Sequence, residues 1–526
     1  MNMHHCRYLS ILRHKPIQIA ICKHYSSEEH LLKNFSKHVN ITESEARYLS
    51  LKQPVIKKLD ETKLQCLLST IQDLGFSKQV LLNQPSLFGI VPFTLRYRYR
   101  VLQECGIATI TPEHLCSYLP LVKQKTISQL KKSGDISVFI NVENRLASYL
   151  TQWPTSVTTL ISEDVNKLSL YNIRLKIIQR YLELELDLTK EEFNRGVETY
   201  PTIKHRPLEV LNEVLQILLS QIMMPKHKIK SNLYLLHSDP ENIRDIILKL
   251  RTIGGIDVRE VIRMRPKLAM KNCSTMIEIK NILYEYEINN EAQKRCFDIY
   301  TLAPSTVRER LERARNMPEF NTFYNHPRFL KMIHYNNTVL KRLNKLYDNN
   351  KKCMSLNILS GSSAHYEVFE KAPGDRLGKG KDLLFCVSQL LSTKYSMNEI
   401  RKVLKRHPFW INIPLVQVKF VCHNLLKEYS NEDIYENCPI LLYPWNKIRD
   451  TLLILNGEST PKKFPISIEY CNLNQLKKSQ KLSLALYILE KNHYFTGNGV
   501  WTEEKSKTSN NLFDGVQKEG NYASNV

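Results

Sequence analysis

The chain has 526 residues and carries 75 Lys and Arg against 52 Asp and Glu, a formal net charge of +23 at neutral pH. This basic balance favours an anionic partner, either nucleic acid or an anionic membrane surface. No stretch approaches 18 uninterrupted apolar residues, because the best candidate, from Leu211 to Met224, contains Asn, Glu, Ser and Gln. We therefore expect no insertion into a membrane.

The 12 cysteines are irregularly spaced and form neither a CxxC pair nor a close Cys/His quartet. A zinc site and a disulfide framework would each need such spacing, so neither is expected. Free buried thiols in a reducing compartment fit the pattern better. The sequence predicts no metal site and no cofactor.

The first 27 residues contain Arg and Lys, with His and Ser, and no acidic residue precedes Glu28. This composition is typical of a mitochondrial transit peptide. We expect processing near Tyr25 and Ser26. A basic N-terminus without regular structure is the alternative left open.

The segment 74–107 has a clear internal order. Ser77 can cap a short helix that Pro85 ends by removing an amide donor, and a sharp corner follows. Thr94 can then open a second helix, and Gly106 stands where a left-handed C-terminal cap belongs. The expected unit is helix, proline corner, helix.

This order recurs along the chain. The residue five positions before the corner is apolar or aromatic in eight of nine copies, the exception being Gly196. The aligned corner prolines are Pro85, Pro120, Pro154, Pro201, Pro240, Pro266, Pro304, Pro408 and Pro439. Helix-start signals precede several corners: Thr111 before Pro112, and the capping-box pairs Asp257/Glu260, Ser396/Glu399 and Ser430/Asp433, to which Thr42/Glu45 adds an earlier one. The pattern predicts an all-α array of divergent helical repeats, a solenoid.

Two breaks interrupt the array. The stretch 348–381 is polar and contains Gly, Ser and Pro, and a second break begins at Asn456. The expected organisation is a transit peptide (1–27), an N-terminal helical cap (28–62), a repeat array (63–347), a flexible insertion (348–381), C-terminal repeats (382–455), a C-terminal helical segment (456–496) and a disordered tail (497–526).

Three segments, LGFSKQVLLNQPSLF from Leu74, TIGGIDVREVIRMRPKLAM from Thr252 and YSMNEIRKVLKRHPFWI from Tyr395, resemble repeats of the mitochondrial transcription termination factor (mTERF) family. The similarity spans residues 63–455. The resemblance implies a crescent-shaped superhelix of paired short helices, with a basic concave side that follows mitochondrial nucleic acid. Members of the family are linked to termination or initiation of transcription on mitochondrial DNA, and some to ribosomal RNA and ribosome assembly.

Lys and Arg residues in or just before the second helices are the candidate nucleic-acid contacts, because cations there could neutralise phosphates. They are Arg96, Arg98, Arg100, Lys123, Lys125, Lys204, Arg206, Lys271, Arg308, Lys419, Lys447 and Arg449. The alternative for each is a solvated charge on a helix surface.

No catalytic motif is present. The segment GDRLGKGK, from Gly374, resembles a phosphate loop, but Lys379 stands where the Walker motif requires glycine and no buried strand precedes it. We interpret it as a flexible basic loop and predict that the protein is not an enzyme.

The prediction is therefore a protein of the mitochondrial matrix nucleoid that binds double-stranded mitochondrial DNA and regulates transcription, with termination as the expected step. Two alternatives stay open. One is a ribosome-assembly factor that binds mitochondrial ribosomal RNA. The other is an adaptor that another mTERF-family protein recruits to DNA.

Overall fold

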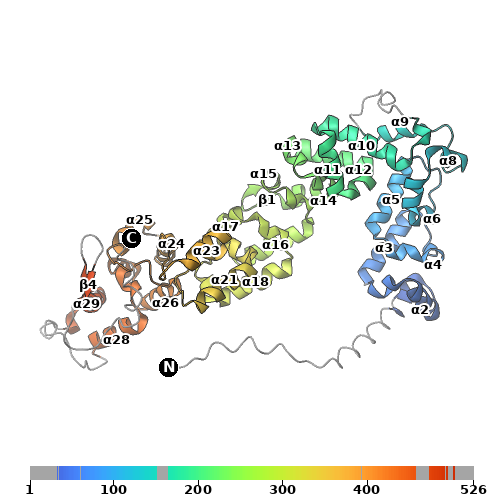
Figure 1. Ribbon diagram of the computed structural model, residues 1–526. Helices are drawn as coiled ribbons and strands as arrows, with labels where there is room; N and C mark the ends of the chain where they lie inside the picture. The colour runs from blue at the N-terminus through green and yellow to red at the C-terminus, as the bar shows by residue number, and fades with distance from the viewer. Residues whose placement is uncertain are drawn as a thin grey trace. The chain divides into compact units, whose positions relative to one another are not determined.

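The computed structural model describes residues 32–33, 35–59, 61–150, 164–392, 394–457, 473–491, 493–495 and 501–503. The predicted transit peptide lies outside these ranges. The chain divides into two compact units, Met1–Asp245 and Ile246–Val526, each of which we describe by itself (Figure 1).

Unit 1 is mainly helical, and its described residues include two isolated β-bridges, Ile107–Ile136 and Thr126–Ser169. Its elements, in which η denotes a 3₁₀ helix except for the π-helical η6, are α2 (Glu43–Lys52), η1 (Pro54–Lys58), α3 (Glu61–Asp73), α4 (Val80–Asn83), η2 (Pro85–Gly89), α5 (Pro92–Glu104), α6 (Pro112–Cys116), α7 (Tyr118–Gln124), α8 (Ile127–Lys132), α9 (Val142–Ala147), η4 (Val165–Lys167), α10 (Leu170–Leu186), α11 (Lys190–Thr199), η5 (Pro201–His205), α12 (Leu208–Gln216), η6 (Ile217–Gln221), α13 (Lys226–Lys230), η7 (Leu233–His237) and α14 (Pro240–Asp245).

Unit 2 is also mainly helical. Its elements, with η8 again π-helical, are η8 (Ile246–Leu250), β1 (Thr252–Ile253), β2 (Ile256–Asp257), α15 (Val258–Met264), η9 (Pro266–Met270), α16 (Cys273–Glu285), α17 (Asn290–Arg295), η10 (Phe297–Thr301), α18 (Pro304–Asn316), α19 (Pro318–Asn321), α20 (Phe329–His334), α21 (Asn336–Asp348), α22 (Leu356–Ser360), α23 (Ser363–Lys371), α24 (Lys381–Leu390), α25 (Met397–Leu404), α26 (Leu415–Leu425), α27 (Asn431–Glu436), η11 (Cys438–Leu442), α28 (Trp445–Leu455), η13 (Leu473–Gln475), α29 (Lys478–Glu490), β3 (His493–Phe495) and β4 (Trp501–Glu503).

The predicted corner is a short 3₁₀ helix. Pro85, Pro201 and Pro266 are the first residues of η2, η5 and η9, and Pro439 is the second residue of η11. Proline suits these positions because the first amides of a helix have no intrahelical acceptor. The repeat of helix, corner and helix is therefore confirmed, and these four corners are turns of 3₁₀ helix. Pro408 also lies between two helices, α25 and α26, but the corner there consists of turns without a 3₁₀ helix.

Two of the aligned prolines do not stand at a corner, as predicted, but at the start of the helix that follows it. Pro240 and Pro304 begin the following helices α14 and α18, while the corners before them, η7 and η10, contain no proline. Both roles place proline at a helix start, so the sequence pattern alone did not separate them. Pro120 lies inside α7, and Pro154 lies outside the described residues.

The second helix of the first unit, α5, begins at Pro92, two residues before the predicted Thr94. Leu95 and Leu102 are fully buried, seven positions apart on one side of this helix. Gly106 has φ +84°, and the prediction of a left-handed cap is confirmed.

The capping predictions mostly hold. Complete capping boxes form at Thr42/Glu45, Ser396/Glu399 and Ser430/Asp433. Thr111 accepts from the amide of His114, and Pro112 opens α6. The Asp257 carboxylate accepts from the amide of Arg259 and forms no box with Glu260. Local sequence therefore fixes where these helices begin.

Gly196, the exception to the apolar position, has a steric reason. A Cβ atom there would lie 2.3 Å from Cδ1 of Leu233, which belongs to η7. Leu233 fills the place that the expected apolar side chain would take. The close contact between α11 and η7 therefore explains why glycine replaces the expected apolar residue.

The prediction of a flexible insertion at 348–381 is wrong for its first part, which contains α22 and α23. The hydroxyls of Ser355 and Ser362 cap the two helices. Cations hold the other ends: Arg342 Nη1 donates to the carbonyls of Ile358, Leu359 and Gly361, and Lys351 Nζ donates to those of Phe369, Glu370 and Ala372. The short helices depend on tertiary capping, which the polar composition does not reveal.

The end of the chain departs from prediction at two places. His493–Phe495, in the segment predicted to be helical, pairs antiparallel with Trp501–Glu503, in the segment predicted to be disordered. Aromatic and β-branched residues favour such pairing. The rest of the predicted tail lies outside the described residues.

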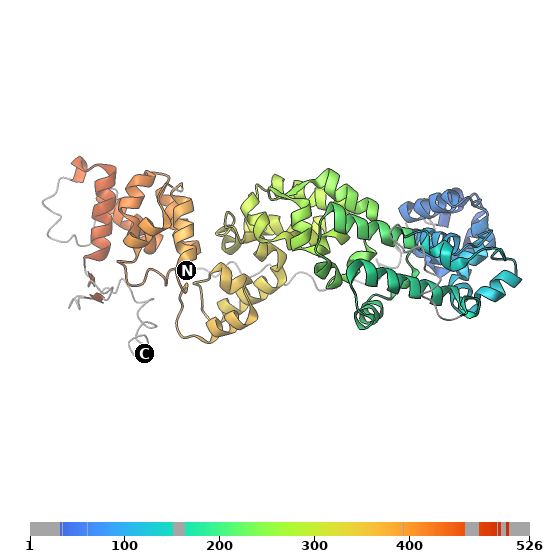
Figure 2. The same cartoon turned by 90° about the horizontal axis from the view of Figure 1, so that it is seen from above.

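Packing within unit 2 places α24 against both α25 and α26, and α28 against α29, in the orange and red part of the ribbon in Figure 2. Leucine, isoleucine and valine fill the contacts, for example Leu383, Ile400 and Val418, all fully buried. Within the ranges described above, no helix is both long enough and apolar enough to cross a membrane.

Candidate nucleic-acid interface

A pocket of about 540 Å³ lies in unit 1 between α5, the segment around α7, η5 and the end of η7. Its wall is cationic and aromatic. The lining residues are Phe93, Thr94, Tyr97, Arg98, Tyr118, Leu119, Lys123, Thr202, His205, Arg206 and His237. No Asp or Glu occurs among these described residues, so nothing in the wall balances the cations.

Arg98 is held at this pocket by two contacts. Its Nη1 donates to the carbonyl of Leu115 at 2.7 Å, and its guanidinium lies 5.4 Å from the ring centroid of Tyr118. Burial lowers the pKa of Arg98, but an arginine stays charged near neutral pH. The Arg98 guanidinium is thus held in place without a ligand, is half-buried and keeps its charge.

Lys123 of α7 and Lys204 of η5 meet over one ring. Their Nζ atoms lie 5.1 and 6.0 Å from the ring centroid of Tyr171, on α10. Neither lysine forms an ion pair with another described residue. The negative face of the ring offsets part of their repulsion, and two ammonium groups remain available to an anion.

His205 and His237 add no charge to the pocket at neutral pH. Burial, followed by the charges of Lys123 and other nearby cations, lowers the pKa of His205 to about 4. Burial, followed by the charge of Arg206, lowers the pKa of His237 to about 4. The positive potential therefore comes from Arg and Lys alone.

Arg206 has a structural role in the described arrangement. Its side chain is buried, donates to the carbonyl of His237 at 3.0 Å and to that of Ser238, and lies 5.1 Å from the ring of Tyr97. These contacts tie the end of η5 to the end of η7. Arg206 therefore closes the back of the pocket.

A buried ion pair stands behind the pocket and was missed from the sequence. Arg174 of α10 is 1% exposed and lies 2.7 Å from Glu104 of α5. Arg174 also donates to the carbonyl of Arg206 at 2.6 Å, and Glu104 accepts from the amide of Glu209 at 3.1 Å. The pair joins α5, α10 and the start of α12. The apolar neighbours of Arg174 and Glu104 on their own helices were the only sequence feature that could have indicated this pair.

The other predicted residues of unit 1 differ from this cluster. Arg96 pairs with Asp73 at 2.9 Å, and Lys125 pairs with Asp135 at 3.5 Å. Arg100 is exposed on α5 and forms no ion pair within the described residues. Carboxylate partners reduce the field that Arg96 and Lys125 offer to a polyanion.

The predicted residues of unit 2 are engaged locally and form no comparable cluster among themselves. Lys271 donates to the carbonyl of Thr301 at 2.9 Å, Arg308 pairs with Glu285 at 2.6 Å, and Arg449 pairs with Asp450 at 3.0 Å. Lys447 is partly exposed on α28. Their part in nucleic-acid binding stays a prediction.

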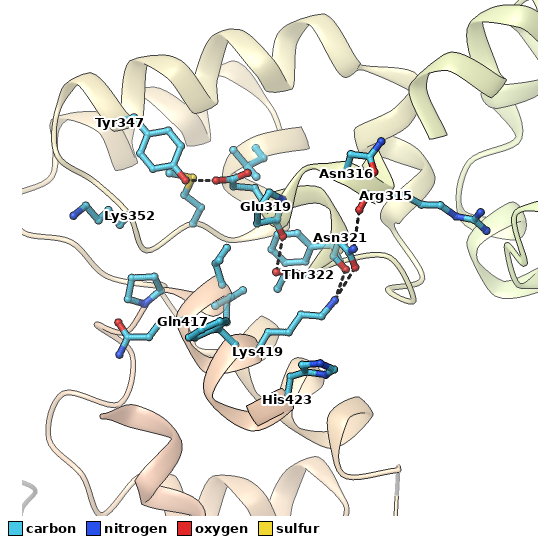
Figure 3. Close-up of a pocket in the computed structure, with 18 residues that line it drawn as sticks. Arg315, Asn316, Glu319, Asn321, Thr322, Tyr347, Lys352, Gln417, Lys419 and His423 are labelled. Atoms are coloured by element: carbon cyan, nitrogen blue, oxygen red, sulfur yellow. Dashed lines mark hydrogen bonds between the residues drawn. The ribbon is translucent and has the colours of Figure 1, made fainter. Parts of the chain in front are cut away.

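Lys419, the remaining candidate, lies in a different kind of pocket (Figure 3). This cavity of about 790 Å³ has an apolar wall that includes Phe323, Leu415 and Phe420. Lys419 Nζ crosses it to donate to the carbonyl and Oδ1 of Asn321, at 2.9 and 2.7 Å. Lys419 thus caps the end of α19, and burial lowers its pKa.

The described side chains offer no metal centre, since no group of three or more His, Cys, Asp or Glu is arranged to hold an ion. The described cysteines are free, and most are buried. The side chains that the unit 1 pocket offers are therefore positioned cations and aromatic rings.

The fold and this pocket define the class: a mainly α-helical repeat protein with short 3₁₀ corners and a cationic pocket. The chain is 30% identical over 456 residues to "Transcription termination factor 5, mitochondrial" of Drosophila melanogaster, a match that covers 86% of this chain and 80% of that protein. It belongs to the mitochondrial transcription termination factor family. No protein-family model matches the chain, and no solved structure does.

Proposed function

We propose that the protein binds double-stranded mitochondrial DNA through the unit 1 pocket and thereby regulates mitochondrial transcription, with termination as the regulated step. It acts in the matrix nucleoid and catalyses no reaction. One observation carries the proposal: Arg98 and Lys123 line a pocket wall without a carboxylate, and Lys204 meets Lys123 over the ring of Tyr171 beside it. The name of the Drosophila relative and the transit-like N-terminus support the location.

The proposed contact is with phosphates. Arg98 can donate to phosphate oxygens while Leu115 and Tyr118 hold its guanidinium, so little side-chain entropy is lost on binding. Lys123 and Lys204 would each displace condensed counterions from the duplex. A repeat protein anchored in this way would obstruct a polymerase that travels along the DNA.

A pair of lysine variants tests the proposal. Lys123→Gln/Lys204→Gln should lower affinity for a mitochondrial DNA duplex roughly tenfold and reduce the slope of log affinity against log salt by about 2. The matched control Lys125→Gln/Lys190→Gln removes the same charge from exposed positions outside the pocket and should bind nearly as the wild type does. Equal weakening in both variants would contradict a role for the pocket.

The alternatives predict different results with the same purified protein. If structured ribosomal RNA displaces the duplex at lower concentration than competitor duplex does, the RNA-binding alternative replaces this proposal. If the purified protein binds neither but shifts DNA when another member of the family is added, the adaptor alternative replaces it.

A further inference from the structure

The apolar pocket that contains Lys419 adjoins a second cavity in unit 2, of about 570 Å³. We name the larger one, of about 790 Å³, the α26 cavity. The wall of the second cavity is more polar and includes Asn325 and Gln389. Four residues line both cavities: Arg315, Asn321, Thr322 and Lys419. Lys419 therefore stands where an apolar and a polar space meet.

Apolar side chains form most of the wall of the α26 cavity. Phe323, Met354, Leu359 and Leu415 line it, and each is at most 5% exposed. The volume lies within the range of about 300–1,000 Å³ that is usual for sites of small molecules. This wall suits an apolar chain, because such a chain brings no polar group that would need a partner.

The ammonium of Lys419 is only partly satisfied by the protein. It reaches across from α26 and donates to the carbonyl and to Oδ1 of Asn321, at 2.9 and 2.7 Å (Figure 3). A lysine ammonium has three donors, and no described residue accepts from the third. One N–H group at the boundary of the two cavities is thus available to a ligand.

No negative charge beside Lys419 balances its ammonium. Burial lowers the pKa of Lys419, and the opposing influence comes from the thiol of Cys386. Burial raises the pKa of Cys386 to about 12, so this thiol is neutral near pH 7. A half-buried cation without a counter-charge is stabilised by an anion that enters its cavity.

The rest of the wall is also positive in balance. Among its described residues, Arg315 and Lys352 add two cations, and Glu319 is the one carboxylate. Glu319 accepts from the hydroxyl of Tyr347. Glu287, whose charge acts on Arg315, lines the second cavity and not the α26 cavity. The α26 cavity therefore combines an apolar wall with an excess of positive charge.

We propose that the α26 cavity binds a long-chain carboxylate, with the apolar chain against Phe323 and Leu415 and the carboxylate on Lys419. The carboxylate accepts from the third donor and supplies the missing negative charge. Each CH₂ group that the wall buries raises the affinity by up to roughly fourfold. The proposal concerns unit 2 and does not rest on duplex binding by the unit 1 pocket.

Calorimetric titration of the full chain with three ligands, each below its micelle-forming concentration, tests the proposal. Dodecanoate should bind at one site per chain. Dodecanol has the same chain without the charge and should bind about tenfold more weakly. Octanoate has the same charge on a shorter chain and should also bind more weakly, by about tenfold or more. Equal affinities for dodecanoate and dodecanol would overturn the proposal.

A lysine variant tests the position of the carboxylate. Lys419→Met should remove the preference for dodecanoate over dodecanol, because the ammonium is the group that distinguishes them. The control Lys341→Met removes the same charge from an exposed position on α21, outside both cavities, and should keep the preference. A preference that persists in Lys419→Met would place the carboxylate elsewhere and overturn the proposal.

A variant that keeps Lys419, and with it the cap of α19, tests the position of the chain. Val416 lines the α26 cavity, and Val416→Trp should fill it and abolish binding of dodecanoate and dodecanol alike. The matched control Val368→Trp changes an exposed valine on α23, outside both cavities, and should bind as the wild type does.

Two results with the filled cavity would contradict the assignment. Dodecanoate affinity that survives Val416→Trp would overturn the proposal, because the chain would then bind at another place. A wild type that binds no dodecanoate but forms a dimer in sedimentation, lost in Val416→Trp, would also overturn it and assign this apolar wall to a second copy of the chain.

Discussion

The cations of the unit 1 pocket and the exposed cations that directly follow α25 in unit 2 differ in what holds them. Arg98 and Lys123 are fixed by a carbonyl or by aromatic faces, whereas Lys405 and Arg406 have no partner among the described residues. Fixed cations offer an anion one geometry at a small entropic cost. Cations that no partner holds offer charge but no fixed geometry to an anion. The difference shows that charge alone defines no contact geometry, which unit 1 adds through Leu115, Tyr118 and Tyr171.

The largest expected effect comes from breaking the scaffold behind the pocket. Arg174→Met leaves the Glu104 carboxylate buried without its partner, and we expect a loss of about 3–5 kcal/mol in the free energy of unfolding. Urea denaturation measures it, and hydrogen exchange should accelerate in α5 and α10. The double variant Glu104→Gln/Arg174→Met should recover much of the loss. A wild-type stability for Arg174→Met would show that the pair does not hold the pocket.

A second variant breaks the tertiary cap of α23 in unit 2. Lys351→Met leaves three carbonyls at the end of α23 without their donor, which should cost about 1–3 kcal/mol locally. Amide exchange in residues 363–371 should rise, because the carbonyls at the end of α23 lose their donor. Unchanged exchange would restore the interpretation of this segment as a flexible insertion.

A pH titration sharpens the comparison, because the pocket contains two histidines of lowered pKa that face cations. His205 and His237 have an ordinary pKa of 6.5 when unfolded and about 4 when folded, so the unfolded chain takes up their protons first. Stability should therefore fall as the pH drops from about 6.5 towards 4, by on the order of 1 kcal/mol per residue after solvent screening.

The control for this titration is His205→Gln/His237→Gln, which should flatten that part of the stability curve. Bound phosphate would favour the protonated imidazoles, so duplex affinity should rise as the pH falls through the same range. A duplex affinity that does not change with pH in the wild type would contradict phosphate binding beside these histidines.

The smallest effect is expected at Arg96. Its ion pair with Asp73 is exposed, and Arg96→Gln should change the free energy of unfolding by less than about 0.5 kcal/mol. Duplex affinity should follow the order of losses Arg98→Gln, then Arg100→Gln, then Arg96→Gln. A greater loss for Arg96→Gln than for Arg98→Gln would place the contact on the outer face of α5.

Local rules explain what the sequence could predict. Proline at the start of η2 and η9, the left-handed Gly106 and the capping boxes at Ser396 and Ser430 depend on neighbours within a few residues. These features suffice for the repeat and its helical class. These local features determine the order of helices and corners along the chain. They do not determine which elements pack against each other.

Tertiary contacts explain what the sequence could not predict. Lys123 and Lys204 are far apart in the chain and meet only because both pack over Tyr171. The twelve predicted cations could not be divided into paired and unpaired groups, since their carboxylate partners are also distant, as Asp73 is from Arg96. The polar stretch 348–381 concealed two helices because Arg342 and Lys351 supply their C-terminal contacts from outside them.

Lysine acetylation footprinting of the full chain, with and without a mitochondrial DNA duplex, tests the central claim most directly. We predict that the bound duplex slows acetylation of Lys123 and Lys204. Acetylation of Lys190, and of Lys125, which is paired with Asp135, should change little. Protection of Lys190 and Lys125 with full reactivity at Lys123 and Lys204 would contradict it.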